Sequence, residues 1–151
     1  MNYIHPEARL HPTVVVGPFT CIHEDVEIGE GTIIDSNVTI YGGVRIGKNC
    51  HIHAGAVIGG DPQDLKFKGE YSTAVIGDRT VIRECVTISR GTAAKGTTIV
   101  GSDCLIMACA HVAHDCVVGN HVILVNGVLL AGEVEVGDWA ILGGQTAVHQ
   151  L

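Results

Sequence analysis

Residues 22–58 read IHEDVEIGEGTIIDSNVTIYGGVRIGKNCHIHAGAVI, and an aliphatic residue returns at every sixth position. These positions are Ile22, Ile28, Ile34, Ile40, Ile46, Ile52 and Ile58. The residue four places after each of the first six is small or β-branched: Val26, Thr32, Val38, Val44, Cys50 and Ala56. An α-helix repeats its apolar residues at about every 3.6 positions and a flat strand at every second. A strict period of six fits neither, and it is typical of a solenoid of short strands.

The same period extends outward in both directions along the chain. Its further aliphatic positions are Ile4, Leu10, Val16, Ile76, Ile82, Ile88, Val100, Ile106, Val112, Val118, Leu124, Leu130, Val136, Leu142 and Val148. We predict an all-β fold, a parallel β-helix in the form of a triangular prism, in which three hexads close each coil. The aliphatic side chains point inward, and no coil can bury its inner face without its neighbours. Residues 1–151 are predicted to form this one domain.

Two stretches break the repeat. Residues 60–74 contain Pro62, Phe67 and several charges that do not suit one side of a coil, so we predict a loop that leaves the prism there. A second break lies at residues 91–98, where Ala94 falls on an inward position and Lys95–Gly96 is predicted to form a turn. Loops on a rigid scaffold often carry function.

Composition excludes several classes of protein. The formal net charge of −7 argues against a general nucleic-acid binder. No apolar run is long enough to span a bilayer, and the N-terminus lacks the features of a signal peptide. We therefore expect no stable membrane insertion and a cytoplasmic location. The six cysteines are expected to be reduced thiols, several of them acting as small core residues.

Residues 108–119 read ACAHVAHDCVVG and place two histidines and an aspartate in an otherwise apolar stretch. His111, His114 and Asp115 can be metal ligands, a base with its orienting acid, or solvated surface. His114 stands two residues after the inward Val112, so it does not belong to the core. Adjacent strand residues point to opposite faces, so His114 and Asp115 can pair only where a turn bends the chain.

Five motifs extend this pattern: PQDLKFKGE (62–70), IGDRTVIRECVTISRGT (76–92), VGSDCLIMACAHVAHDCVVGNH (100–121), LAGEVEVGD (130–138) and LGGQTAVHQ (142–150). Together they resemble the bacterial UDP-N-acetylglucosamine O-acyltransferases, hexapeptide-repeat enzymes that begin the synthesis of lipid A and hence of lipopolysaccharide. The resemblance implies a left-handed prism, a homotrimer, and transfer of a (3R)-hydroxyacyl group from acyl carrier protein to the 3-hydroxyl of UDP-GlcNAc. It implies no metal and no redox cofactor, because the carrier-protein thioester is the acyl donor.

The resemblance also implies roles for individual residues. His114 is expected to be the general base, Asp115 the residue that orients it, and Gly132 the donor of an oxyanion-hole amide. The substrate contacts implied are Asp64, Lys66, His111, His149 and Gln150. The remaining histidines are interpreted as surface or corner residues rather than ligands: His5, His11, His23, His51, His53 and His121.

The chain departs from the family pattern in three places. Glu133 and Ser89 stand where many members have histidine, and we assign neither a role. Leu151 falls within a hexad that has just begun, so we expect the C-terminal coils and helical domain of the family to be absent from this chain and the chain itself to be a truncated, inactive fragment.

Two other functions fit a prism of this kind. One is a zinc enzyme resembling the γ-type carbonic anhydrases, with His111 and His114 among the ligands. The other is a non-catalytic solenoid that serves as a binding module.

Overall fold

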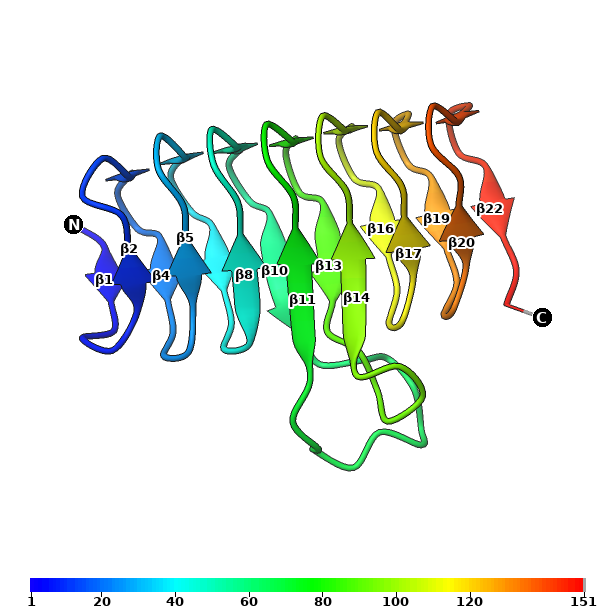
Figure 1. The fold of residues 1–151 in the computed structure, drawn as a ribbon, viewed down its shortest axis with the longest axis horizontal. Helices are drawn as coiled ribbons and strands as arrows, with labels where there is room; N and C mark the ends of the chain where they lie inside the picture. The colour runs from blue at the N-terminus through cyan, green and yellow to red at the C-terminus, as the bar shows by residue number, and fades with distance from the viewer. Residues whose placement is uncertain (151) are drawn as a thin grey trace.

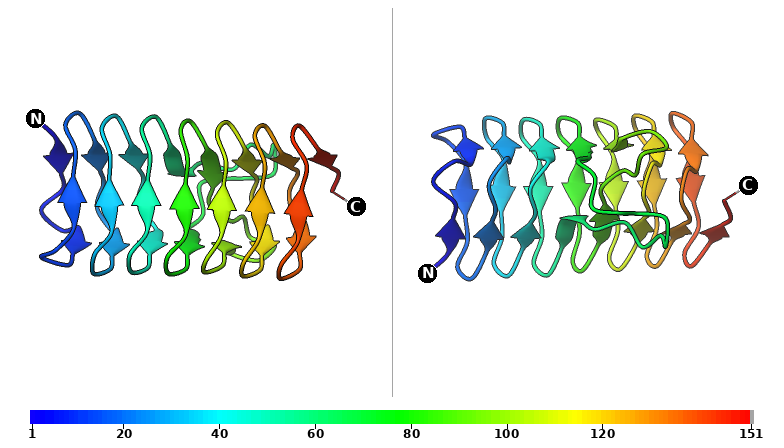
Figure 2. Two further views of the ribbon diagram at one scale, coloured as in Figure 1. Left: turned by 90° about the horizontal axis from the view of Figure 1, so that it is seen from above. Right: turned by 90° about the horizontal axis from the view of Figure 1, so that it is seen from below.

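The computed structural model describes residues 1–150, and these residues form a prism of short parallel strands wound into stacked coils (Figure 1). The strands fall into three sheets, one for each side of the prism, and every third strand along the chain belongs to the same sheet. The two chain ends of the described part lie at opposite ends of the prism (Figures 1 and 2). The predicted left-handed parallel β-helix is confirmed.

Sheet A holds eight strands: β1 (Tyr3–Ile4), β4 (Cys21–Ile22), β7 (Thr39–Ile40), β10 (Val57–Gly60), β13 (Thr87–Ser89), β16 (His111–Val112), β19 (Leu129–Leu130) and β22 (Ala147–Val148). Sheet B holds seven: β2 (Arg9–Leu10), β5 (Glu27–Ile28), β8 (Val44–Ile46), β11 (Thr73–Ile76), β14 (Thr97–Val100), β17 (Val117–Val118) and β20 (Glu135–Val136). Sheet C holds the other seven: β3 (Val15–Val16), β6 (Ile33–Ile34), β9 (His51–Ile52), β12 (Val81–Ile82), β15 (Leu105–Ile106), β18 (Ile123–Leu124) and β21 (Ile141–Leu142). No helix that could span a membrane occurs among the described residues.

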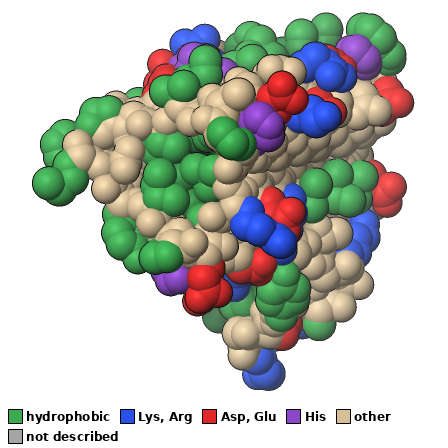
Figure 3. All heavy atoms as spheres, turned by 60° about the vertical axis from the view of Figure 1, so that its left-hand side comes forward, with side chains coloured by type: hydrophobic (Ala, Val, Ile, Leu, Met, Phe, Trp, Pro, Cys, Tyr) green, Lys and Arg blue, Asp and Glu red, His purple; other side chains and the backbone are tan. Residues whose placement is uncertain are grey.

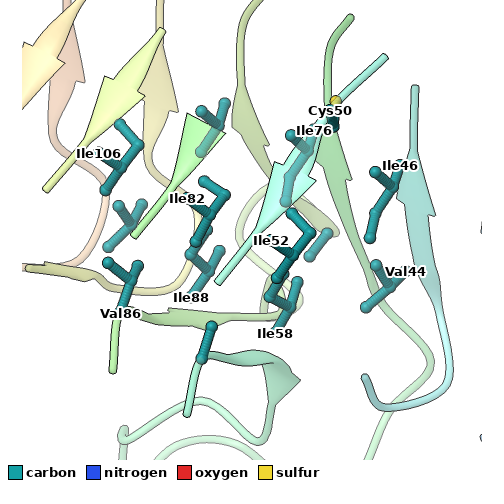
Figure 4. Close-up of a cluster of buried hydrophobic side chains, with 14 of the residues drawn as sticks. Val44, Ile46, Cys50, Ile52, Ile58, Ile76, Ile82, Val86, Ile88 and Ile106 are labelled. Carbon is teal, nitrogen blue, oxygen red and sulfur yellow. The ribbon is translucent and has the colours of Figure 1, made fainter. Parts of the chain in front are cut away.

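The sixfold aliphatic residues fill the inside of the prism. Ile52, Ile58, Ile82 and Ile106 are fully buried, and Figure 4 shows them pointing inward from strands of sheets A and C. Each coil covers the inner face of the next, so burial weakens only at the ends, where Ile4 is 38% exposed. Figure 3 shows the corresponding apolar side chains ringed by backbone at the N-terminal end.

The small positions support the corners. Thr32 is buried, and its hydroxyl donates to the Gly47 carbonyl at 2.8 Å and accepts from the Cys50 amide at 3.1 Å. Cys50, Cys104 and Cys116 are buried in the core, and burial is the largest cause of their raised thiol pKa values. The expectation that several cysteines act as small core residues is confirmed.

The two breaks leave the prism side by side, next to β11 and β14 (Figures 1 and 2). The first loop spans residues 61–72, slightly less than predicted, because β10 continues to Gly60 and β11 begins at Thr73. The second spans residues 90–96. Ala94 is exposed there, so its predicted inward position was wrong: the chain has already left the prism. The Glu70 carboxylate accepts a hydrogen bond from the Ala93 amide at 3.2 Å, which joins the loops.

Candidate active site

His114 and Asp115 lie in the corner turn between β16 and β17. Asp115 has a φ of 63°, a left-handed conformation that turns the chain sharply. Because of this turn, the two adjacent side chains meet instead of pointing to opposite faces. Nδ1 of His114 lies 2.9 Å from Oδ2 of Asp115. The structure thus supplies the bend that the pairing requires.

The Asp115 carboxylate is fully buried but well hydrogen-bonded. It accepts from the backbone amides of Thr92 at 2.9 Å and Lys95 at 3.2 Å, from the Thr92 hydroxyl, and from His114. Burial alone would raise its pKa, but the hydrogen bonds from Thr92, His114 and Lys95 outweigh burial and hold the pKa of Asp115 below its ordinary value. Asp115 is therefore an ionised hydrogen-bond acceptor.

An ionised acceptor at Nδ1 fixes the state of the His114 ring. Nδ1 must carry the proton that it donates to Asp115, which leaves the lone pair of a neutral ring on Nε2. Nε2 lies 3.8 Å from Oδ2 of Asp64, a residue of the 61–72 loop. The predicted loop residue and the predicted base are thus brought together, and the His114 side chain keeps 8% of its surface exposed. A ring held in this way can accept a proton from a bound hydroxyl.

A groove of about 420 Å³ opens beside His114. Its lining includes the predicted residues His111, Gly132, His149 and Gln150, together with apolar residues of β19 and β22. His111 shares a hydrogen bond of 2.7 Å between its Nδ1 and the Thr87 hydroxyl. Burial, with a smaller effect of the His114 charge, lowers the pKa of His111, so this ring is neutral near pH 7.

Gly132 lies one coil after His114, at the equivalent corner position. A Cβ on Gly132 would collide with Cε1 and Nε2 of the His114 ring and would lie 2.8 Å from Oε1 of Gln150. Glycine is therefore required here by close approach, not by backbone conformation. Among the described residues, no hydrogen-bond acceptor is found for the Gly132 amide. Gly132 thus lies against the His114 ring.

The other predicted and unassigned residues take varied positions. Lys66 is exposed and does not line the groove. Glu133 accepts a hydrogen bond from the Gln150 side chain at 2.7 Å, which ties the last described coil to the one before it. Ser89 is buried at the end of β13. From the sequence, Glu133 was known only as a position where the chain departs from the family pattern.

Sequence reasoning missed the residues that hold the predicted ones in place. Thr92 and the Lys95 amide bind Asp115, Thr87 binds His111, and Gln63 lines the groove. The signal for Thr92 and Lys95 was the second break in the repeat, because both belong to it. No comparable signal marks Thr87, which occupies an ordinary outward position on β13.

A larger groove of about 790 Å³ lies on sheet B, above Gly29, Gly47 and Gly77. Its polar rim consists of residues such as Arg9, Glu27 and Arg45. It contains none of the predicted site residues. The smaller groove, which holds a paired imidazole and an open amide, is the better candidate for catalysis.

The comparisons with known proteins agree with the repeat. The family described as "Bacterial transferase hexapeptide (six repeats)" matches residues 25–60 and 97–132. A Pseudomonas putida protein named acyl-[acyl-carrier-protein]–UDP-N-acetylglucosamine O-acyltransferase is 60% identical over 148 residues, which is 97% of this chain and 57% of that protein. A Pseudomonas aeruginosa protein of the same name is 62% identical over the same shares. The chain therefore spans little more than half the length of these relatives.

Solved structures give the same result. LpxA from Acinetobacter baumannii has a TM-score of 0.97 and 42% identity, with 98% of this chain and 58% of that chain covered. The UDP-N-acetylglucosamine acyltransferase of Francisella novicida has a TM-score of 0.97 and 46% identity, with 98% and 54% covered. These likenesses extend over nearly every coil described above.

Proposed function

Since the chain belongs to the hexapeptide-repeat transferases, in the UDP-N-acetylglucosamine O-acyltransferase family, we propose that the full protein transfers a (3R)-hydroxyacyl group from acyl carrier protein to the 3-hydroxyl of the GlcNAc unit of UDP-GlcNAc. This reaction is the first step of lipid A synthesis in the enzymes of that name. The observation that carries the proposal is the His114–Asp115 pair, which lies in a groove beside the unpaired Gly132 amide.

The proton follows a short path in the proposed reaction. Nε2 of His114 takes the proton of the sugar hydroxyl as its oxygen attacks the thioester carbonyl. The ionised Asp115 stabilises the imidazolium that forms, and it does so without taking the proton. General-base help of this kind contributes about 10²–10⁴-fold to the rate. The carbon–sulfur bond then breaks, and His114 gives the proton to the departing thiolate.

The tetrahedral intermediate needs a donor for its oxyanion. The Gly132 amide fills this role in the proposal, and a single donor of this type contributes about 10²–10³-fold. The thioester is already activated, so the scheme uses neither a covalent acyl-enzyme nor a metal or redox cofactor. One oxygen–carbon bond forms, one carbon–sulfur bond breaks, and the proton moves from the hydroxyl to the thiolate. No further reactant is needed.

The other predicted residues act in binding. Neutral His111 offers a ring nitrogen to a substrate hydroxyl, and His149 and Gln150 line the far side of the groove. Asp64, 3.8 Å from the base, holds the sugar near His114. Lys66, exposed on the same loop, is free to reach a diphosphate.

A homotrimer in the cytoplasm completes the proposal. Leu129, exposed in the groove wall, and the exposed outward residues Val15, Ile33 and Ile141 of sheet C offer apolar surface to neighbouring subunits. The exposed free thiols of Cys85 and Cys109 suit a reducing compartment. Sedimentation equilibrium should give three times the chain mass, and a fully active monomer would contradict a site between subunits.

The two rival functions are not favoured. His111 and His114 both use Nδ1 for other partners, Thr87 and Asp115. A non-catalytic module does not explain the buried carboxylate that holds His114, and the similar named proteins are acyltransferases.

The test is an acyl-transfer assay of the complete protein with UDP-GlcNAc and (3R)-hydroxyacyl carrier proteins of several chain lengths. We expect an ester product that mild base cleaves, and we expect His114→Ala to lower the rate about 10²–10⁴-fold with an unchanged melting temperature. His121→Ala, a histidine remote from the groove, is the matched control. A His114→Ala protein with most of its rate would refute the assigned base, and an amide product would refute the hydroxyl acceptor.

A further inference from the structure

A second cluster of polar side chains lies on sheet C, away from the groove. Asp35, His51 and His53 place one carboxylate oxygen and two ring nitrogens within 4.8 Å of one another. Nε2 of His51 is 2.9 Å from Oδ1 of Asp35, and Nδ1 of His53 is 3.5 Å from Oδ2. From the sequence alone, both histidines were interpreted as surface or corner residues.

The register of the prism creates this cluster. Ile33 of β6 pairs with His51 of β9, so Asp35 and His53 occupy the same corner position in consecutive coils. The Asp35 amide donates to the Ile52 carbonyl at 2.9 Å. The scaffold beneath the three side chains is therefore held by ladder hydrogen bonds. It is as rigid as the rest of the sheet.

The arrangement of the two rings is suited to a metal ion. The imidazoles of His51 and His53 are stacked, with centroids 3.9 Å apart and planes 14° apart, and both direct a nitrogen to the same carboxylate. A tetrahedral zinc ion with bonds of about 2.0–2.1 Å keeps its ligand atoms about 3.3 Å apart. The two ring nitrogens lie 2.9 and 3.5 Å from the two Asp35 oxygens, and one donor atom from each residue lies within 4.8 Å of the others. Small side-chain rotations would bring them onto one ion.

The charged neighbours of the cluster are Arg83 and Glu84. Arg83 is paired with Glu84 at 2.9 Å, which reduces the repulsion that its charge would exert on a cation. The side chains of His51, His53 and Asp35 are 37%, 20% and 36% exposed in the single chain.

A simple ion pair explains this geometry less well. His121 and Asp103 lie 4.0 Å apart elsewhere on the prism, where the histidine stacks on Trp139 and Arg79 also pairs with the carboxylate at 2.8 Å. That pair has one imidazole and no second ring directed at the carboxylate. The sheet C cluster differs by having both rings converge on one acid.

We propose that Asp35, His51 and His53 form a binding site for a divalent transition metal of the zinc type, with water in the remaining position. Two imidazoles and one carboxylate suit zinc, nickel and copper, whereas magnesium and calcium require mostly oxygen ligands. The ion would join two consecutive coils at a corner of the prism. The site is independent of the proposed acyl transfer, because none of its ligands lines the His114 groove.

Titration of the purified protein with Zn²⁺ by calorimetry tests the site. The exposed thiols of Cys85 and Cys109 can bind zinc themselves, so the measurement uses a Cys85→Ser, Cys109→Ser background. We expect one ion per chain, a higher melting temperature with zinc, and no competition from Mg²⁺ or Ca²⁺. Co²⁺ in place of zinc should give the strong visible absorption of a four-coordinate site.

Variants assign the ligands. His51→Ala and His53→Ala should each weaken zinc binding by at least about 100-fold, since loss of a ligand costs more than the 10–100-fold typical of its supporting partners. Asp35→Asn should also weaken it, and His121→Ala, the matched control, should bind as the parent does. Circular dichroism checks the fold of each variant, and the exposed His51 keeps the test valid if Asp35→Asn fails to fold. Absence of stoichiometric binding in the parent, or unchanged affinity in both histidine variants, would overturn the proposal.

Discussion

The coils of residues 22–58 repeat the hexad without interruption, whereas two loops interrupt it in residues 60–98. In the first region every coil repeats its predecessor, and its inward residues are buried as the period requires. In the second region the chain leaves the prism twice. The excursions return Asp64, Thr92 and Lys95 to one corner, around His114 and Asp115. The comparison indicates that regular coils provide stability and register, while the interruptions provide chemistry.

Removing a core side chain from the regular region should give the largest effect on stability. Ile52 is fully buried among neighbouring inward residues (Figure 4), so Ile52→Ala should lower the free energy of unfolding by about 2–5 kcal/mol. Urea unfolding measures this loss. The acyl-transfer rate per folded molecule should remain unchanged below the melting temperature. A variant that is as stable as the parent but transfers the acyl group slowly would contradict the assignment of stability to the regular coils.

A methyl group added at the corner of the site should lower the acyl-transfer rate and leave the stability unchanged. Gly132→Ala should displace the His114 ring and lower kcat by roughly 100-fold, because small misplacements of catalytic groups have effects of that size. Gly137→Ala is the matched control, since a Cβ there meets nothing within 4 Å. Equal rates for the two variants would show that the ring does not need its observed position.

Two threonine substitutions distinguish the contribution of the second loop from that of the regular coils. Thr92→Val removes the hydroxyl that binds Asp115, and it should slow acyl transfer about tenfold, the equivalent of one hydrogen bond of ordinary strength. Thr32→Val removes a corner hydroxyl in the regular region. That change should lower the melting temperature and leave kcat unaltered. If both variants retain full rates, the second loop does not contribute to the site.

The smallest expected effect is a pH dependence of stability. Burial lowers the pKa of His111, so below its ordinary value of about 6.5 the unfolded chain binds a proton that the folded chain does not. Stability should therefore fall as the pH drops from about 6.5 toward the lowered pKa, by at most about 1.4 kcal/mol per pH unit. Urea unfolding at several pH values should show a shallower slope for His111→Gln. An identical slope would contradict a buried neutral ring.

The limits of prediction from sequence follow the same division. Within the regular coils, neighbours in space lie one coil apart, so the burial of Ile22 through Ile58 and the approach of Gly132 to His114 follow from counting. Across the second excursion the offset changes, and Thr87 pairs with His111 instead of a residue one regular coil away. The length of a loop cannot be converted into a register without coordinates. For this reason the candidate base His114 was predicted from sequence, but Thr87 and Thr92, which bind His111 and Asp115, were not.

A structure of the complete protein with bound UDP-GlcNAc tests the central claim most directly. The account predicts that the 3-hydroxyl oxygen lies about 2.6–3.2 Å from Nε2 of His114, while Nδ1 remains hydrogen-bonded to Asp115. A sugar bound with its 3-hydroxyl against another side chain, and the His114 ring directed away from it, would contradict the account.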